Sequence, residues 1–362
     1  MTDSLSRRAM LNRLSAAIAL PIGVAGLGPI GAARAMSTSQ ASRTGVAGGP
    51  YQPLWTQYLS RYMTGGGRIK DTANGDISHT EGQGYAMLLA EAFDDLKSFD
   101  ALWSWTKSSL RRPEDGLYSW RYEAGKGITD PNNASDGEIL LAWALMRAAR
   151  RWGRADYAQE SATLRALILR HLVVRWNGMP VILPAVQYFD KDDHLVVNLS
   201  YWIFPALQAF AAEDGEPWSA INQSGLSLLN QAVFGPFSLP PDWMALPKPG
   251  GSITLAQDMD SLFGFNAVRI PLYLYWGGIV PSSVRGGQGI CNFWRQHGER
   301  PPATIDVATG ELAPYPISQG VRAINSISCG NGPLKHPHID EDPYYSATLL
   351  LLTLVANAEI TL

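Results

Sequence analysis

One acidic residue stands among small and amide-bearing residues just before an apolar stretch. In the segment SHTEGQGYAM the acid is Glu81, and the LLAEAF that follows is apolar enough to begin a buried helix. Ser78 and Thr80 are good capping residues and the helix dipole favours an acid in the first turn, so Glu81 has a purely structural explanation. Gly82 and Gly84, however, are poor helix formers and leave room for a ligand to approach. A carboxyl group among apolar neighbours is also expected to keep its proton at neutral pH, which would suit an acid held for chemistry.

Further polar groups stand at the starts of two other expected helices. Asp136 in NNASDGEIL is followed two residues later by Glu138, and helix capping explains one of these acids without any chemistry. In GFNAVRIPLYLYW, Asn266 and Arg269 precede a very apolar helix. Arg269 is suited either to orient an acid or a ligand hydroxyl, or to form an ordinary surface ion pair. Together with Glu81, these residues are the chain's candidates for acid–base chemistry.

Long helical patterns alternate with loops rich in Gly and Pro, and they must position these residues. Apolar residues at spacings of three and four predict two consecutive helices over 84–110 and one over 135–152, with Ser135 or Asp136 as its N-cap. Further helices are expected at 157–174, 200–213, 218–233, 267–280 and 344–360, and a local β-hairpin at 172–183. Many helices and few strand patterns favour a single all-α domain, a closed ring of helical hairpins whose long loops gather at one end.

The composition argues against several classes of function. The 362 residues carry a net charge of −3, which is not the basic footprint of a nucleic-acid-binding protein. The six His lie at no zinc-ligand spacing, so we expect no metal site. Twelve Trp and fourteen Tyr are many, and a surplus of rings often lines a groove for flat, hydroxyl-rich ligands. Cys291 and Cys329 are too few for a disulfide scaffold, and both a disulfide and two buried thiols are open to them.

Residues 1–35 have the pattern of an export signal. SRRAML carries a twin arginine, an apolar run follows, and Ala33-Arg34-Ala35 is an A-x-A cleavage pattern. A transmembrane anchor is the alternative, but prolines and glycines interrupt the run, which is also short for spanning. Residues 36–50 are expected to be a flexible lead-in, and no later segment is apolar enough to span a membrane. We therefore expect a secreted or periplasmic protein whose single domain is 51–362.

Six motifs occur in an order that resembles glycoside hydrolase family 8. They are SHTEGQGYAM, NNASDGEILLAWAL, NLSYWIFP, LPPDW, FNAVRIPLYLYW and DPYYSATLLLL, and the resemblance runs from about Gln52 to the C-terminus. The chain is especially similar to the endoglucanases that accompany bacterial cellulose synthesis. This resemblance implies an (α/α)6 barrel with a glycan cleft, a β-1,4-glucan substrate, hydrolysis with inversion and no cofactor. We also expect a monomer, with the cellulose synthase export complex as a candidate partner.

The resemblance gives roles to three residues and departs from the family at one of them. Glu81 matches the family's proton donor, and Asp136 matches an acid that holds the sugar at the cleavage point. Asn266 stands where the family's cellulases have the base aspartate of a Y-D-A-x-R motif. A neutral amide is not a general base for the attacking water, although it can hold that water by hydrogen bonds. Glu138 stands where the family usually has a second Asp.

Three explanations of Asn266 are open at this point. It is an engineered substitution that traps substrate, or another acid is the base, with Asp258 and Asp260 near in sequence. In the third explanation the chain is a natural glucan-binding protein with little hydrolytic activity. A chitosanase or a xylanase would share the acid and differ in its contacts to the sugar.

Several further residues are candidates for binding a glycan chain. They are Trp120, Tyr201, Trp202, Asp242, Trp243, Arg269 and Tyr344. Aromatic rings stack on the apolar faces of glucose, but core packing is the alternative for each of them. Trp120 and Trp243 are expected in loops and are therefore the stronger candidates. Three other rings fall within amphipathic helices and are expected in the core: Trp103, Trp105 and Trp143.

Overall fold

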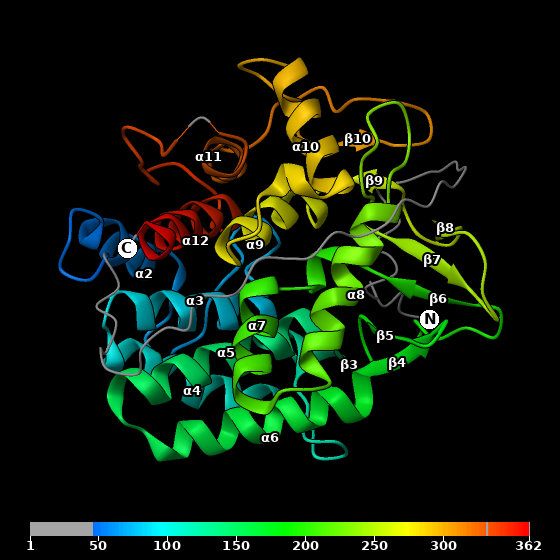
Figure 1. The fold of residues 1–362 in the computed structure, drawn as a ribbon. Coiled ribbons are helices and arrows are strands. Elements are labelled where there is room, and N and C mark those ends of the chain that lie inside the picture. Colours follow the sequence, from blue (N-terminus) through cyan, green and yellow to red (C-terminus); the bar gives the residue numbers. More distant parts are fainter. Residues whose placement is uncertain (1–45, 331, 362) are drawn as a thin grey trace.

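Helices are the main secondary structure of the computed structural model, which describes residues 46–330 and 332–361 (Figure 1). Its eleven described α-helices are α2 (Gln52–Tyr62), α3 (Thr80–Ala92), α4 (Leu96–Leu110), α5 (Ser135–Trp152), α6 (Ala155–Leu172), α7 (Phe204–Asp214), α8 (Trp218–Gln231), α9 (Ile270–Trp276), α10 (Arg285–Gln296), α11 (Gln319–Ser328) and α12 (Tyr344–Ile360). Three short 3-10 helices are Leu199–Tyr201, Ala267–Arg269 and Pro281–Ser283. The expected export signal at 1–35 lies outside the described residues, as does 36–45 of the lead-in; residues 46–50 form turns, and Val46 is buried.

The helices predicted from apolar spacing are present, but their caps differ from the prediction. The α5 helix covers 135–152 as expected, yet its N-cap is Ala134, which makes no side-chain capping bond. The cap of α3 is His79, whose Nδ1 accepts a hydrogen bond from the backbone N–H of Gly82 at 3.0 Å, and not Ser78 or Thr80. Apolar spacing does not predict α2, α10 or α11. In α10 the reason is a run of glycines, which lower helix propensity but let the helix pack closely on its neighbours.

Five helices contact one another in a closed ring that forms the core. The ring runs from α3 to α5, α7, α9 and α12, and α12 returns to α3. The helices α4, α6, α8, α10, α11 and α2 pack outside it, each against a ring member that is its neighbour (Figure 1). Twelve of the thirteen residues of α3 and twelve of the seventeen of α12 are buried, because other elements cover α3 and most of α12 on every side. The five inner and six outer described helices have the form of the expected (α/α)6 barrel, and only α10 and α11 follow each other on the outside.

Short antiparallel strands lead into the starts of the ring helices. One sheet pairs β1 (Ser78–His79), β2 (Ser119–Glu123) and β3 (Gly127–Asn133), another pairs β6 (His194–Val197), β7 (Met244–Pro247) and β8 (Thr254–Leu255), and β9 (Leu262–Phe263) pairs with β10 (Ile305–Asp306). The predicted hairpin at 172–183 is confirmed as β4 (Val173–Trp176) and β5 (Met179–Ile182). In chain order β1 precedes α3, β3 precedes α5, β6 precedes α7 and β9 precedes α9. The sheets therefore anchor the N-terminal ends of these inner helices.

Of the two states open to the cysteines, a disulfide or two buried thiols, the structure has the disulfide. Cys291 in α10 and Cys329 at the end of α11 form a disulfide, with their Cα atoms 5.4 Å apart. This bond joins two outer helices of the barrel. Among the residues that the structure describes, no helix is both long and apolar enough to cross a membrane.

Candidate active site

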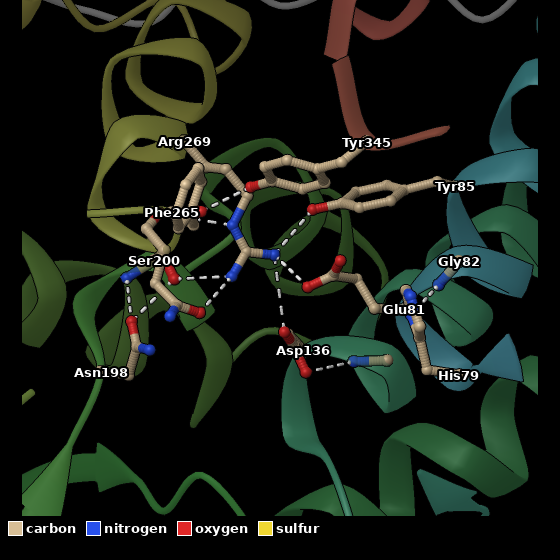
Figure 2. Close-up of polar contacts among 12 residues, drawn as sticks. His79, Glu81, Gly82, Tyr85, Asp136, Asn198, Ser200, Phe265, Arg269 and Tyr345 are labelled. Atoms are coloured by element: carbon tan, nitrogen blue, oxygen red, sulfur yellow. Dashed lines mark hydrogen bonds and ion pairs between the residues drawn. The ribbon is translucent and has the colours of Figure 1, made fainter. Parts of the chain in front are cut away.

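Arg269 lies at the centre of a buried polar cluster. Its side chain is 1% exposed, and it ends the 3-10 helix that leads into α9. Nη1 donates to the Glu81 carboxylate and, at 2.8 Å, to Tyr85 Oη, whereas Nη2 donates to Ser200 Oγ at 3.0 Å and to Asn266 Oδ1 at 2.9 Å (Figure 2). Of the two roles open to Arg269 from the sequence, the structure therefore favours orienting an acid and excludes a surface ion pair.

Glu81 sits in the first turn of α3 with its carboxylate directed at Arg269 (Figure 2). Its side chain is 18% exposed, so the acid is anchored and still reachable from solvent. Burial raises the pKa of Glu81, but the charges of Arg269 and His79 and the hydrogen bonds with Asp136 and Arg269 outweigh it, so the pKa lies below its usual value. The expectation that Glu81 keeps its proton at neutral pH is therefore wrong for the free protein.

Asp136 reaches the same guanidinium from the start of α5. It is 1% exposed, its Oδ2 lies 3.5 Å from Arg269 Nη1, and its Oδ1 accepts a hydrogen bond from the backbone N–H of Gly137 at 2.9 Å. Glu81 and Asp136 thus share one nitrogen of one arginine. The arrangement groups two acids around a fixed positive charge, and charge partners of this kind shift pKa values at functional sites.

Two glycines allow α3 and α5 to approach this closely. A Cβ atom on Gly137 would collide with the side chain of Thr80 and lie 3.0 Å from the backbone N of Glu81. A Cβ atom on Gly84 would lie 2.5 Å from Cβ of Leu140. Gly84 therefore allows the two helices to pack closely. The expectation that it leaves room for a ligand is wrong.

Asn266 lies on the Nη2 side of Arg269, opposite the nitrogen that Glu81 contacts. It is half-buried; Oδ1 accepts from Arg269, and Nδ2 donates to Asp242 Oδ2 at 3.3 Å. Asp242 is 3% exposed, and its Oδ1 accepts from the backbone N–H groups of Gly264 at 3.1 Å and Ala267 at 2.7 Å. In the free protein the Asp242 carboxylate therefore holds the segment that carries Asn266, and its contact with substrate stays a prediction.

Most rings predicted to stack on a glycan are packed in the core instead. Trp202 is fully buried and its Nε1 donates to the carbonyl of Ile221 at 3.0 Å. Trp243 is 2% exposed and its ring stacks on that of Phe189 at 5.6 Å. Tyr344 is also fully buried, with its ring edge-on to neighbouring aromatic side chains. Core packing, the alternative kept open for each ring, holds for these three.

The remaining predicted rings are buried as well, although one of them borders the cluster. The ring of Tyr201 lies 6.0 Å from the guanidinium carbon of Arg269. Trp120 lies on β2 and not in a loop, and it is 7% exposed. As expected, Trp103 and Trp143 belong to the core, and Trp105 packs against it half-buried.

Sequence reasoning missed an exposed ring beside Asn266. Phe265 is 43% exposed, and its carbonyl accepts a hydrogen bond from Tyr345 Oη at 2.5 Å (Figure 2). An exposed aromatic at this place offers the stacking face that the buried rings do not. The signal was its position inside the FNAVR motif, directly before Asn266.

The acids proposed as alternative bases both lie in the connection between β8 and β9. Asp258 is in the connection between β8 and β9, where it pairs with Lys191 Nζ at 2.8 Å. Asp260 lies in the same connection, two residues before β9. The acid that contacts Asn266 is Asp242, which the sequence analysis did not consider as a base.

Glu138 is fully buried and has a separate, structural place. Its Oε1 accepts from the backbone N–H of Tyr118 at 2.8 Å and from Asn133 Nδ2 at 3.5 Å, which ties the β2–β3 region to α5. Burial raises its pKa to about 8, although these hydrogen bonds act in the opposite direction. Glu138 is therefore largely neutral at pH 7.

Comparisons with known proteins agree with this geometry. The model of the family "Glycosyl hydrolases family 8" matches residues 24–359. An endoglucanase of Cellulomonas uda is 42% identical over 284 residues, which is 77% of this chain and 78% of that protein. Among solved structures, endoglucanase Cel10 of Klebsiella pneumoniae has a TM-score of 0.80 and 41% identity, over 84% of this chain and 98% of that chain.

A second solved structure gives the same result with a closely similar score. The endo-β-1,4-glucanase CMCax of Acetobacter xylinum has a TM-score of 0.81 and 33% identity, over 89% of this chain and 100% of that chain. The family match over residues 24–359 covers both the ring of helices and the segments that carry Glu81, Asp136 and Arg269. On this evidence the chain belongs to glycosyl hydrolase family 8, as its six ordered motifs implied.

Proposed function

We propose that the protein is an endo-β-1,4-glucanase that hydrolyses internal bonds of cellulose or a related β-1,4-glucan with inversion. One observation carries the proposal: Glu81 is partly exposed at the start of α3 and is anchored by buried Arg269 beside Asp136. Glu81 is the general acid that protonates the leaving oxygen, and Asp136 holds and distorts the sugar at the cleavage point. The similarity to the endo-β-1,4-glucanase CMCax supports the choice of substrate.

Glu81 must carry a proton before it can act, and its pKa in the free protein is lowered. A bound sugar removes water from the 18% of the side chain that is exposed, and this loss of solvation raises the pKa of a carboxyl group. Substrate binding therefore supplies the protonated acid that the free site lacks.

The release of reducing ends from carboxymethylcellulose tests this function. Glu81→Gln keeps the size and polarity of the side chain but cannot donate a proton, so the rate should fall by about 10²–10⁴-fold. The matched control is binding of cellopentaose by calorimetry, which the variant should retain. Proton NMR of the first-formed product should show the α-anomer. Undiminished hydrolysis by Glu81→Gln would remove Glu81 from the mechanism.

A second candidate function is a glucan-binding protein with little activity. The amide at Asn266 favours it, because no carboxylate occupies that position. This function predicts that cellopentaose binds while no reducing ends appear over a long incubation. Parallel assays on chitosan and xylan separate the glucanase from related enzymes that share the acid.

We also propose that the protein is exported and trims glucan during cellulose synthesis, as a monomer. The signal pattern of residues 1–35 and the motif similarity to endoglucanases of cellulose-producing bacteria support this proposal. Mass spectrometry of protein recovered outside the cytoplasm should give a mature N-terminus near residue 36. Recovery of the protein inside the cytoplasm with residues 1–35 intact would contradict it.

A further inference from the structure

The polar cluster holds two acids on one side of Arg269 and one acid on the other. Hydrolysis with inversion needs about 6.5–9.5 Å between the acid and the base, so that a water fits between the base and the anomeric carbon. Asp136 lies on the same nitrogen of Arg269 as Glu81 and within hydrogen-bonding reach of it. Asp136 is therefore too close to Glu81 to serve as the base.

The carboxylate on the opposite side is Asp242, which the site contacts through Asn266. Asn266 Oδ1 accepts from Arg269 Nη2 at 2.9 Å, and its Nδ2 donates to Asp242 Oδ2 at 3.3 Å. Asp242 is 3% exposed whereas Asn266 is half-buried, so the amide stands between the carboxylate and the solvent. Asn266 therefore links the Arg269 cluster to Asp242 by hydrogen bonds.

We propose that Asn266 and Asp242 together form the proton acceptor of this enzyme. As the oxygen of the attacking water bonds to the anomeric carbon, one water proton passes to Asn266 Oδ1 and one Nδ2 proton passes to Asp242 Oδ2. The bond from the anomeric carbon to the leaving oxygen breaks, and that oxygen takes the proton of Glu81. Asn266 is left as its imidic acid and returns to the amide by the reverse shift, with the proton released to water.

The surroundings of the two side chains favour this path. An amide oxygen has two lone pairs, so Oδ1 can accept from Arg269 and from the water together. The charge of Arg269 beside Oδ1 makes the Nδ2 proton easier to lose and Oδ1 a weaker proton acceptor, so the two proton transfers occur together. Burial raises the pKa of Asp242, so its carboxylate takes up a proton more readily than an exposed aspartate does. The inference rests on the proposed function, since it names the base of that hydrolysis.

Four variants test the inference by turnover of cellopentaose, with folding checked by circular dichroism. Asp242→Asn should lower kcat by about 10²–10⁴-fold. Asn266→Asp places a carboxylate directly at the site and should be active. The double variant Asn266→Asp/Asp242→Asn should then regain kcat to within tenfold of Asn266→Asp, because the new carboxylate replaces the relay. Glu81→Gln should lower kcat by about 10²–10⁴-fold in every background that is active.

The outcomes separate failure of the inference from failure of the proposed function. If Asp242→Asn keeps its activity, or if the folded double variant is as slow as Asp242→Asn, Asp242 only positions its loop and the inference is overturned. The inference is also overturned if the native chain is inert and Asn266→Asp is active. That result would still support the proposed glucanase function. If the native chain and Asn266→Asp are both folded and inert, the proposed function fails.

A second measurement covers the case in which Asp242→Asn does not fold. Asn266→Ala removes the relay at a half-buried position and leaves Asp242 in place, so it should lose hydrolysis of cellopentaose. Azide needs no base to attack the anomeric carbon, so adding it should restore turnover with an α-glycosyl azide as product. Retained hydrolysis, or no rescue by azide, would contradict the relay.

Discussion

At the level of single residues, the site depends on how one buried cation is satisfied. Arg269 contacts Glu81 and Tyr85 from α3, Ser200 from the 3-10 helix after β6, and Asn266 from its own segment. An isolated buried charge costs several kcal/mol, so these acceptors are what allow Arg269 to stay inside. Its planar fork reaches two sides at once, which a lysine ammonium cannot do.

The fork geometry predicts the effect of Arg269→Lys. The ammonium reaches either Glu81 or Asn266, so kcat should fall by about 10²-fold through lost positioning. The loss of stability should be smaller than the about 3–5 kcal/mol that removing one partner of a buried pair costs. Turnover of cellopentaose measures the change in kcat, and urea unfolding measures the change in the free energy of unfolding. Arg295→Lys, on the exposed face of α10, is the matched control and should change neither.

Glu138 predicts a pH dependence of stability that is independent of catalysis. Its pKa rises from 4.5 to about 8 on folding, so the folded state binds more protons between these values. The contribution of Glu138 to the free energy of unfolding is at its maximum below pH 4.5. It declines as pH rises from 4.5 through about 8, by on the order of 5 kcal/mol in total. Glu138→Gln cannot ionise and should lack this decline. Urea unfolding of both proteins at pH 5, 6.5 and 8 checks it, and parallel pH curves would contradict it.

At the level of elements, the starts of helices and the strands before them bring the site together. β1 leads directly into α3 and Glu81, and β3 leads into α5 and Asp136. The two strands belong to one sheet, in which His79 pairs with Arg121 of the strand between them. The distance between the two acids therefore depends on the α3–α5 contact and on this small sheet.

The α3–α5 contact predicts that Gly137→Ala is damaging. Its new Cβ would collide with Thr80 and push the start of α5 away from Glu81. Overpacking of this kind costs about 1–3 kcal/mol, and a displacement of about 1 Å in the site costs about 10²-fold in rate. Gly65→Ala makes the same chemical change where a Cβ meets nothing within 4 Å, so it should be neutral. Thermal unfolding and kcat are measured for both variants, and equal values for Gly137→Ala and Gly65→Ala would contradict the prediction.

Over the whole molecule, the sequence predicted the elements better than the environments of their side chains. Apolar spacing located α5 and α12 because helices buried on one or more sides must repeat at that period. It could not show that Glu81 has a lowered pKa, since Arg269, the charge that lowers it most, lies 188 positions away. The environment of Trp243 was mispredicted because it also depends on a residue distant in sequence. Its place between glycine- and proline-rich segments predicts an exposed ring, but the ring of Phe189 stacks on it.

The disulfide between Cys291 and Cys329 belongs to this largest scale, because it closes 38 residues of chain across two outer helices. In the chain-entropy model a loop of this length contributes about 3–4 kcal/mol. The double variant Cys291→Ala/Cys329→Ala should therefore unfold at a temperature several degrees lower. Its kcat at 25 °C should be unchanged, because neither cysteine contacts the Arg269 cluster. Native protein treated with dithiothreitol should show the same loss; a loss confined to the variant would assign the effect to packing around Cys291 and not to the cross-link.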